Sequence, residues 1–136
     1  VLCEIGVFFA MPWLLRQVNL AQILMVSFAC AVLRFILIGW YVDSLPHVMF
    51  AQVLHAATFG AFHAAAVAMA HHFFQGRHQS KGQALFGSLT YGAGGMVGGF
   101  LSGPIWQYWG ASMLYSCSAA VALLAMLLMG WKLRKV

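Results

Sequence analysis

The 136-residue chain is 63% hydrophobic and only 7% charged, and its formal net charge is +5. A soluble domain averages about 25% charged residues, so this composition excludes a water-soluble domain and predicts an integral membrane protein. Apart from Arg34, the basic residues lie at the ends of apolar stretches, which is typical of a topology signal and argues against nucleic-acid binding. The three cysteines lie inside apolar runs without metal-ligand spacing, and we expect no disulfide, metal site or other cofactor.

Five apolar stretches predict an all-α protein that crosses the membrane several times, because a spanning helix needs about 20 apolar residues. In chain order they cover residues 1–15, 20–42, 46–75, 82–108 and 111–131. The separators are short, which makes neighbouring helices antiparallel. The first stretch is too short to span alone, and the chain starts with Val and has no basic leader. We therefore expect the C-terminal part of a longer protein.

Basic residues alternate between successive turns, which predicts one orientation for the whole chain. They occupy the first and third turns and the tail, as Arg16, Arg77, Lys81, Lys132, Arg134 and Lys135. The second turn holds only Asp43, and the fourth holds no charge. The positive-inside rule then predicts that turns one and three and the C-terminus face the cytoplasm, in an inner (plasma) membrane.

Three ionisable residues lie inside consecutive apolar stretches: Glu4 in the first, Arg34 in the second and His55 in the third. Counting helical rise from the turns places all three roughly 16 to 21 Å above the cytoplasmic face, near the membrane middle. Charge at this depth is costly and is usually functional. The pattern predicts a polar site for substrate or proton movement, and a static charge pair that locks two helices is the alternative.

The third stretch carries five of the six histidines. His55 shares a helical stripe with Gln52 and Phe59, and polar and aromatic groups on one stripe are typical of a wet cavity. His63 continues this stripe, either along the same path or as a hydrogen-bonded packing residue. His71, His72 and His78, at the cytoplasmic end of the stretch and in the turn after it, are expected to be solvated, and without Cys or carboxylate neighbours they do not predict a metal site.

The fourth stretch contains the sequence YGAGGMVGGFLSG, in which glycines recur four residues apart. Small residues at this spacing let helix backbones approach closely, so we expect tight helix packing here, with a flexible gating helix as the alternative. Tyr91, at the start of this motif, is a further candidate for lining the cavity.

Four stretches resemble the major facilitator superfamily, in particular the branch with lactose permease and the phenylpropionate permeases. They are EIGVFFAMPWLLRQV, LRFILIGW, QVLHAATFGAFHAA and GQALFGSLTYGAGGMVGG. The resemblance implies that the five helices are helices eight to twelve of twelve, most of the C-terminal six-helix half. In the sugar permeases an acidic residue on helix eight, an arginine on helix nine and a histidine on helix ten take part in binding and proton coupling. Glu4, Arg34 and His55 stand at the matching places.

One position departs from that pattern. The sugar permease carries a carboxylate one helical turn after the histidine, and here the residue is Thr58. The expected function is therefore secondary transport of a small organic solute (an organic acid, nucleoside or sugar), coupled to protons through Glu4 or His55 or through a residue outside the chain. The expected partners are the solute, protons, the lipid bilayer and an N-terminal transporter half. No enzymatic chemistry is expected.

Two other classes fit the composition. One is a membrane protein that binds a cofactor through histidines, although His55 and His63, two turns apart on one helix, suit a single haem poorly. The other is a structural subunit made of a few membrane helices. An optical spectrum of the purified protein would reveal a bound haem and so tests the first class. Further membrane helices encoded upstream would favour a transporter over the structural subunit.

The charge pattern gives a direct test of topology. Single cysteines introduced as Gln79→Cys and Ser44→Cys, in a cysteine-free background, are expected to react with an impermeant thiol reagent from opposite sides of the membrane. In intact cells only Ser44→Cys should be labelled. Labelling of both positions from outside would contradict the helix assignment.

Overall fold

The computed structural model describes residues 2–133, and all secondary structure in this part of the chain is helical. In chain order the elements are α1 (Leu2–Gln17), α2 (Leu20–Trp40), α3 (Leu45–Ala56), η1 (Ala57–Ala61), α4 (Phe62–Phe73), η2 (Gly76–His78), α5 (Gln79–Gly87), η3 (Ser88–Gly94) and α6 (Gly95–Leu133). Two of the short elements, η1 and η3, are π-helical and continue directly from the α-helices before them. The prediction of an all-α membrane protein is confirmed.

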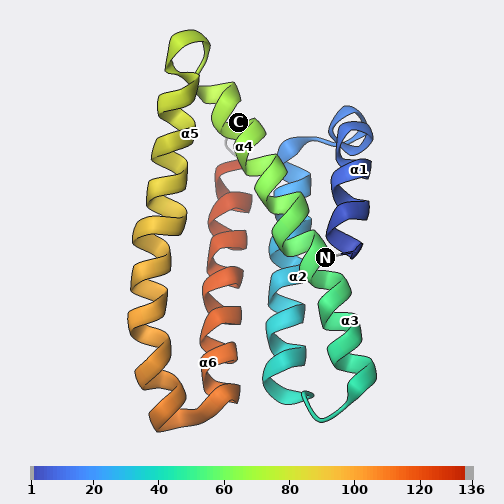
Figure 1. The fold of residues 1–136 in the computed structure, drawn as a ribbon, viewed down its shortest axis with the longest axis vertical. Helices are drawn as coiled ribbons and strands as arrows, with labels where there is room; N and C mark the ends of the chain where they lie inside the picture. The colour runs from blue at the N-terminus through green and yellow to red at the C-terminus, as the bar shows by residue number, and fades with distance from the viewer. Residues whose placement is uncertain (1, 134–136) are drawn as a thin grey trace.

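Three continuous helical stretches are long and apolar enough to cross a membrane: Leu20–Trp40, Leu45–Phe73 and Gly76–Lys132. The third has 57 residues and is interrupted at Gly110, where φ is 78° and ψ is −179°. Glycine adopts this positive φ without the steric cost that a Cβ would bring, and the chain of α6 turns back on itself (Figure 1). α1, with 16 residues, is shorter than a full span. The count of five spans stays a prediction.

The ends of α2 and α3 follow from local sequence. Asn19 caps α2, because its side chain accepts a hydrogen bond from the Ala21 N–H at 3.2 Å and its own N–H donates to the Gln22 side chain at 3.4 Å. This reciprocal arrangement is a capping box. α2 ends at Trp40, two residues earlier than predicted. Pro46 lies in the first turn of α3, where a missing N–H leaves no hydrogen bond unmade.

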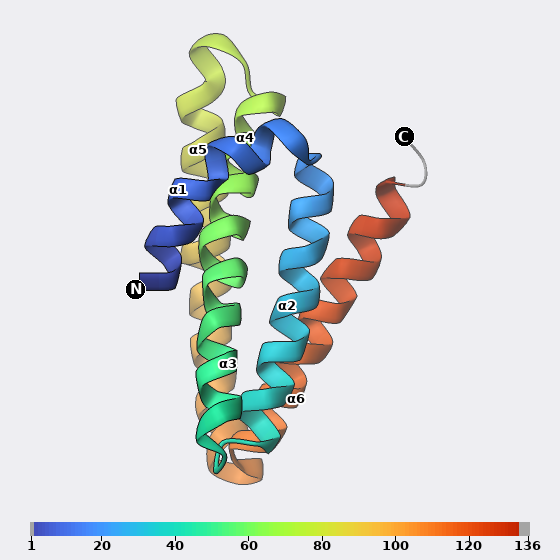
Figure 2. The same ribbon diagram turned by 90° about the vertical axis from the view of Figure 1, so that its right-hand side faces the viewer.

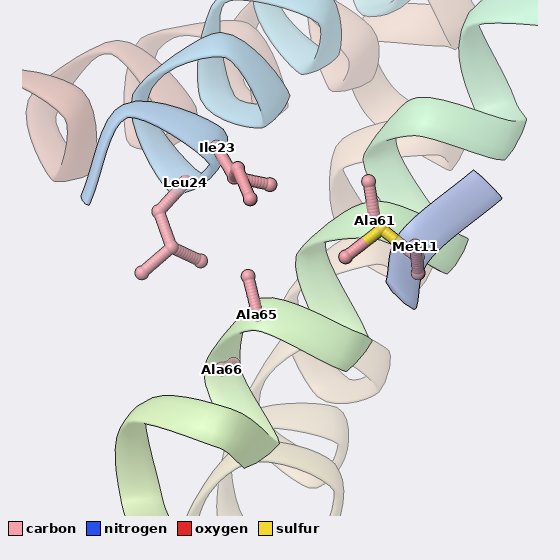
Figure 3. Close-up of a cluster of buried hydrophobic side chains, with 6 residues drawn as sticks. All are labelled: Met11, Ile23, Leu24, Ala61, Ala65 and Ala66. Carbon is pink, nitrogen blue, oxygen red and sulfur yellow. The ribbon is translucent and has the colours of Figure 1, made fainter. Parts of the chain in front are cut away.

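The packed core lies where α1 and α4 meet α2. It contains Met11, Ile23, Leu24, Ala61, Ala65 and Ala66 (Figure 3). The alanines on α4 and at the end of η1 let this helix approach α2 closely, while the longer side chains of α2 and Met11 fill the space above them. α1 contains Pro12, and its course changes direction toward its C-terminal end (Figure 2).

Both limbs of α6 expose large apolar side chains. Phe100 of the first limb is 76% exposed and Val121 of the second limb is 68% exposed, and glycines of the first limb also have open space beside them. Contiguous apolar surface of this kind is disfavoured in water and indicates a surface covered by lipid or by other protein. The predicted close packing of the glycine motif is not made within residues 2–133: a Cβ added at Gly95, Gly98, Gly99 or Gly103 would contact nothing.

A small polar junction joins the end of α2 to the second limb of α6. The Ser112 hydroxyl donates to the Gly39 carbonyl at 2.7 Å, and the Trp40 indole N–H donates to the Ser116 hydroxyl at 3.1 Å. The helices are so close here that a Cβ on Gly39 would lie 2.9 Å from the Cβ of Tyr115. Glycine is therefore required at position 39 by the approach of α6.

This junction predicts a position-specific cost for adding one methyl group. Gly39→Ala is expected to lower the thermal midpoint of the purified intact protein, because overpacking costs about 1–3 kcal/mol and exceeds the gain in helix propensity of about 1 kcal/mol. Gly130→Ala is the matched control at the other end of the same helix pair, where the new Cβ would meet the flexible Met25 side chain at 3.5 Å. The control should be neutral or stabilising. Equal midpoints for the two variants would contradict the described helix approach.

Candidate functional site

Glu4 and His55 meet across two helices. Glu4 lies in the first turn of α1, and His55 lies in the last turn of α3. The distance from the Glu4 Oε1 atom to the His55 Nε2 atom is 3.0 Å, and the two side chains are 22% and 32% exposed. The shared depth predicted from the sequence is therefore matched by direct contact. A carboxylate and an imidazole at this distance share a proton as a hydrogen bond, or form an ion pair when the imidazole is protonated.

The His55 ring is fixed by its own helix as well. The Phe59 ring stacks on it, with ring centroids 5.6 Å apart and an interplanar angle of 21°. The Nδ1 atom of His55 is buried and has no hydrogen-bond partner among the described residues. The hydroxyl of Thr58, the residue where a carboxylate is expected from the sugar permeases, donates to the His55 backbone carbonyl at 3.0 Å. Thr58 therefore bonds to its own helix.

Arg34, half-buried on α2, does not join this pair. No ion pair from Arg34 to Glu4 or Asp43 is seen in the described chain, and its Nε atom is buried without a hydrogen-bond partner. Its guanidinium carbon lies 5.7 Å from the centroid of the Phe35 ring, within the range of a cation–π contact. The structure thus gives a matched Glu4–His55 pair and a separate cation whose charge is not balanced by a carboxylate in residues 2–133.

The π-helical segment η1 changes which residues share a face of the third helix. In a regular α-helix each residue turns by about 100°, so His63, eight residues after His55, would point about 80° away from it. A π segment absorbs one extra residue, which leaves about 20° between the two directions. η1 spans Ala57–Ala61, between the two histidines. It therefore restores the common face that the sequence stripe only approximates.

Tyr91 contacts the third helix through His63. Its hydroxyl lies 2.8 Å from the His63 Nδ1 atom, and the two rings are tilted against each other with centroids 5.9 Å apart. Tyr91 is 50% exposed, and Gln52 is also exposed. Of the six predicted site residues, Glu4, His55 and Phe59 form one cluster. Tyr91 belongs to a second cluster with His63, and Gln52 and Arg34 stand apart from both. The role of these six residues in binding stays a prediction.

A cavity of about 470 Å³ lies elsewhere, between α2, η1, the start of α4 and both limbs of α6. Its polar groups are four hydroxyls, from Ser27, Thr58, Ser102 and Ser118, set among apolar side chains. None of the six predicted residues lines it. A binding site normally combines apolar walls with a few polar groups that fix orientation, and this cavity offers no charged one. The polar clusters are therefore the stronger candidate for a site that recognises a polar solute.

The other histidines have local partners. His71 Nε2 lies 3.2 Å from the Gln83 side-chain oxygen, and His47 Nδ1 lies 2.6 Å from the Ser44 hydroxyl. No group of three or more His, Cys, Asp or Glu side chains that could hold a metal ion occurs between residues 2 and 133. These contacts stabilise helix ends and turns, and they do not extend the Glu4–His55 cluster.

A comparison with protein families decides the class of the protein. A family model described as the MFS_1 like family matches residues 1–117, which is most of the chain. The chain belongs to the MFS_1 like family. The resemblance to the major facilitator superfamily is thereby confirmed, and the chain is part of a multi-pass membrane protein of the transport class. No curated protein and no solved structure matches the chain, and the lactose and phenylpropionate permease branch stays a prediction.

Sequence reasoning missed the link between His63 and Tyr91 in this MFS_1 like chain. It treated His63 as either a path-lining or a packing residue and Tyr91 as an isolated candidate on the next helix. The two are 28 residues apart, on either side of the turn before α5. An antiparallel hairpin brings residues at equal distances from its turn to the same height, and this symmetry is the one signal in the sequence that could have paired them.

The Glu4–His55 contact predicts energetic coupling between the two positions. In a double-mutant cycle, Glu4→Gln and His55→Phe are each expected to lower the thermal stability of the intact protein. Residues in contact typically show a coupling energy of about 0.5–3 kcal/mol. The control cycle pairs Glu4→Gln with His71→Phe, because His71 contacts Gln83 instead. Its stability changes should simply add. A Glu4–His55 cycle that is equally additive would contradict the contact.

Proposed function

We propose that this MFS_1 like chain forms one wall of a secondary transporter that moves a small organic solute together with protons. The observation that carries the proposal is the 3.0 Å contact between the Glu4 carboxylate and the His55 imidazole. Both groups come from helices that are otherwise apolar, where an isolated charge is costly. A carboxylate–imidazole pair can take up or release one proton while its two members compensate each other, which suits a proton-coupled cycle.

Arg34 supports a solute with a negative group. Its guanidinium is half-buried, its Nε atom has no hydrogen-bond partner among the described residues, and Glu4 is engaged with His55. A planar guanidinium binds carboxylates through paired hydrogen bonds, so an organic acid can balance the charge that this chain leaves open. This consideration favours an organic acid over the nucleoside and sugar classes, whose members offer only neutral hydroxyls and ring atoms.

The remaining predicted residues fit roles in lining the path. Gln52 and Tyr91 are exposed and polar, and Phe59 is exposed beside His55. Transporters of this superfamily hold the solute near the membrane midplane between two halves that rock around it. In this proposal a second half of the protein faces these residues. The protein lies in the inner (plasma) membrane of the cell, with its C-terminus on the cytoplasmic side. Symport of this kind forms no covalent bond, and we assign no enzymatic role.

The proposal is tested by uptake into proteoliposomes that contain the intact protein. Three probes cover the three solute classes: benzoate, uridine and lactose. An imposed pH gradient, acidic outside, is expected to drive accumulation of the carboxylate probe beyond the passive uptake of benzoic acid by protein-free liposomes, and in preference to the two neutral probes. His55→Phe should remove the dependence on the gradient. Uptake that ignores the pH gradient, or uptake of none of the probes, would contradict the proposal.

Arg34→Met separates the solute role from folding. Met keeps an apolar stem, and no described carboxylate loses its partner, so thermal stability should stay close to that of the wild type. Benzoate uptake should fall roughly tenfold or more, as expected for the loss of a hydrogen bond to a charged group. Arg34→Lys is the control that keeps the charge but not the planar fork, and it should retain part of the uptake. Unchanged uptake in Arg34→Met would exclude the assigned role.

A further inference from the structure

His63 and Tyr91 form a second polar contact between helices. The 2.8 Å contact from the His63 Nδ1 atom to the Tyr91 hydroxyl joins α4 to η3. The Phe86 ring lies edge-on to the Tyr91 ring, with centroids 6.5 Å apart and an interplanar angle of 84°. The phenol is thus held by His63 through its hydroxyl and by Phe86 through its ring, yet Tyr91 remains 50% exposed. It is positioned and accessible at the same time.

The backbone around this contact is unusual on both sides. Tyr91 lies inside the π-helical segment η3, and His63 follows the π-helical segment η1 by two residues. Short π segments inside α-helices frequently occur at functional sites, because the extra residue re-aims one side chain. Gly92, directly after Tyr91, has open space where a Cβ would stand. Two separate π segments therefore act on the two partners of one hydrogen bond.

The charge on His63 sets the direction of this hydrogen bond. In a neutral imidazole whose proton is on Nε2, Nδ1 is the basic nitrogen, and the phenol, the more acidic partner, donates its proton to Nδ1. The hydroxyl oxygen then offers only acceptor lone pairs to its surroundings. A protonated imidazole carries a proton on both nitrogens, so Nδ1–H donates to the phenol oxygen instead. The phenol proton is then released to donate to another group.

We propose that His63 is a positioning and specificity residue whose protonation converts Tyr91 from a hydrogen-bond acceptor into a donor toward the transported solute. The inference rests on the proposed transport function and deepens it: a solute that carries an acceptor, such as a carboxylate, binds better when His63 is protonated. An imidazole is the side chain whose charge a physiological proton gradient can change, which suits this change of role. The device is separate from the Glu4–His55 pair.

The ionisable groups near His63 are few. Tyr91 is the one in direct contact with it. Other ionisable side chains lie on α4 itself and on the elements near it. They are His71 and His72 of α4, His55 at the end of α3, Cys3, Glu4 and Arg16 of α1, Cys30 and Arg34 of α2, and Lys81 of α5. Glu4 is engaged with His55 and His71 with Gln83. The phenol is thus the group through which protonation of His63 acts.

The test follows the hydroxyl of Tyr91 by Raman spectroscopy of the purified intact protein. The intensity ratio of the tyrosine Fermi doublet reports whether a phenol donates or accepts a hydrogen bond. The signal of Tyr91 is isolated as the difference between the wild type and Tyr91→Phe. Between about pH 8 and pH 5 this difference should change from the donor ratio to the acceptor ratio, in the range where histidine titrates. In His63→Gln it should not change with pH.

A difference signal that is constant with pH in the wild type, or that titrates equally in His63→Gln, would overturn the proposal. Solvent access is checked with Tyr91→Cys, which should react with a charged methanethiosulfonate reagent as Gln79→Cys in the predicted cytoplasmic turn does. An unreactive Tyr91→Cys would also overturn it.

Uptake gives a third measurement. We compare benzoate uptake at acidic pH with uptake at neutral pH, as a ratio, in the wild type and in His63→Gln. This ratio should be several-fold lower in His63→Gln, since a hydrogen bond to a charged group contributes roughly tenfold in affinity. The same ratio in both proteins would count against the proposal. If the wild type transports none of the probes, the proposed transport function fails, whereas the doublet titration still decides the roles of His63 and Tyr91.

Discussion

The apolar surroundings of these helices impose one constraint on which the rest of the structure depends: a buried polar group without a partner costs free energy. The helical backbone satisfies its own N–H and C=O groups, which is why residues 2–133 contain helices as their only secondary structure. Polar side chains pair across helices at four places in the described chain: Glu4 with His55, His63 with Tyr91, His71 with Gln83, and the serines of α6 with the end of α2. Each pairing fixes the relative height of two neighbouring helices.

The polar clusters lie next to interruptions of regular helix. η1 directly follows the helix that ends after His55, and η3 contains Tyr91. Because a π segment absorbs one extra residue, it rotates everything that follows by about 100° relative to a continuous α-helix. On the third helix this rotation brings His63 onto the face of His55. The interruptions are thus part of how the sequence assembles a polar face on helices whose composition is otherwise apolar.

The all-helical fold and the meeting of Glu4 with His55 could be expected from the sequence, because both follow from simple counting along the chain. Glu4 and His55 could be expected at one height, since each lies a known number of residues from a turn. Counting gives height but not direction around the helix axis, and for this reason it grouped Arg34 with the pair although the structure shows Arg34 apart from it. For His63 and Tyr91 the direction also depends on η1 and η3, and no residue type in ATFGA or SLTYGAG marks a π segment.

The separation of Arg34 from Glu4 bears on how the chain achieves charge balance. A guanidinium partly withdrawn from water costs free energy unless an anion compensates it, and the carboxylate nearest in depth is already held by His55. If Glu4 formed an ion pair with Arg34 instead, the guanidinium charge would already be neutralised and would not attract an anionic solute. With Glu4 engaged elsewhere, the compensating charge has to come from a group outside residues 2–133. In the proposed transport function a solute carboxylate would meet that need only while it is bound, so the imbalance that makes the empty site costly would favour binding of such a solute. Protonation of His63, by turning the Tyr91 hydroxyl into a donor, would favour the same charged group.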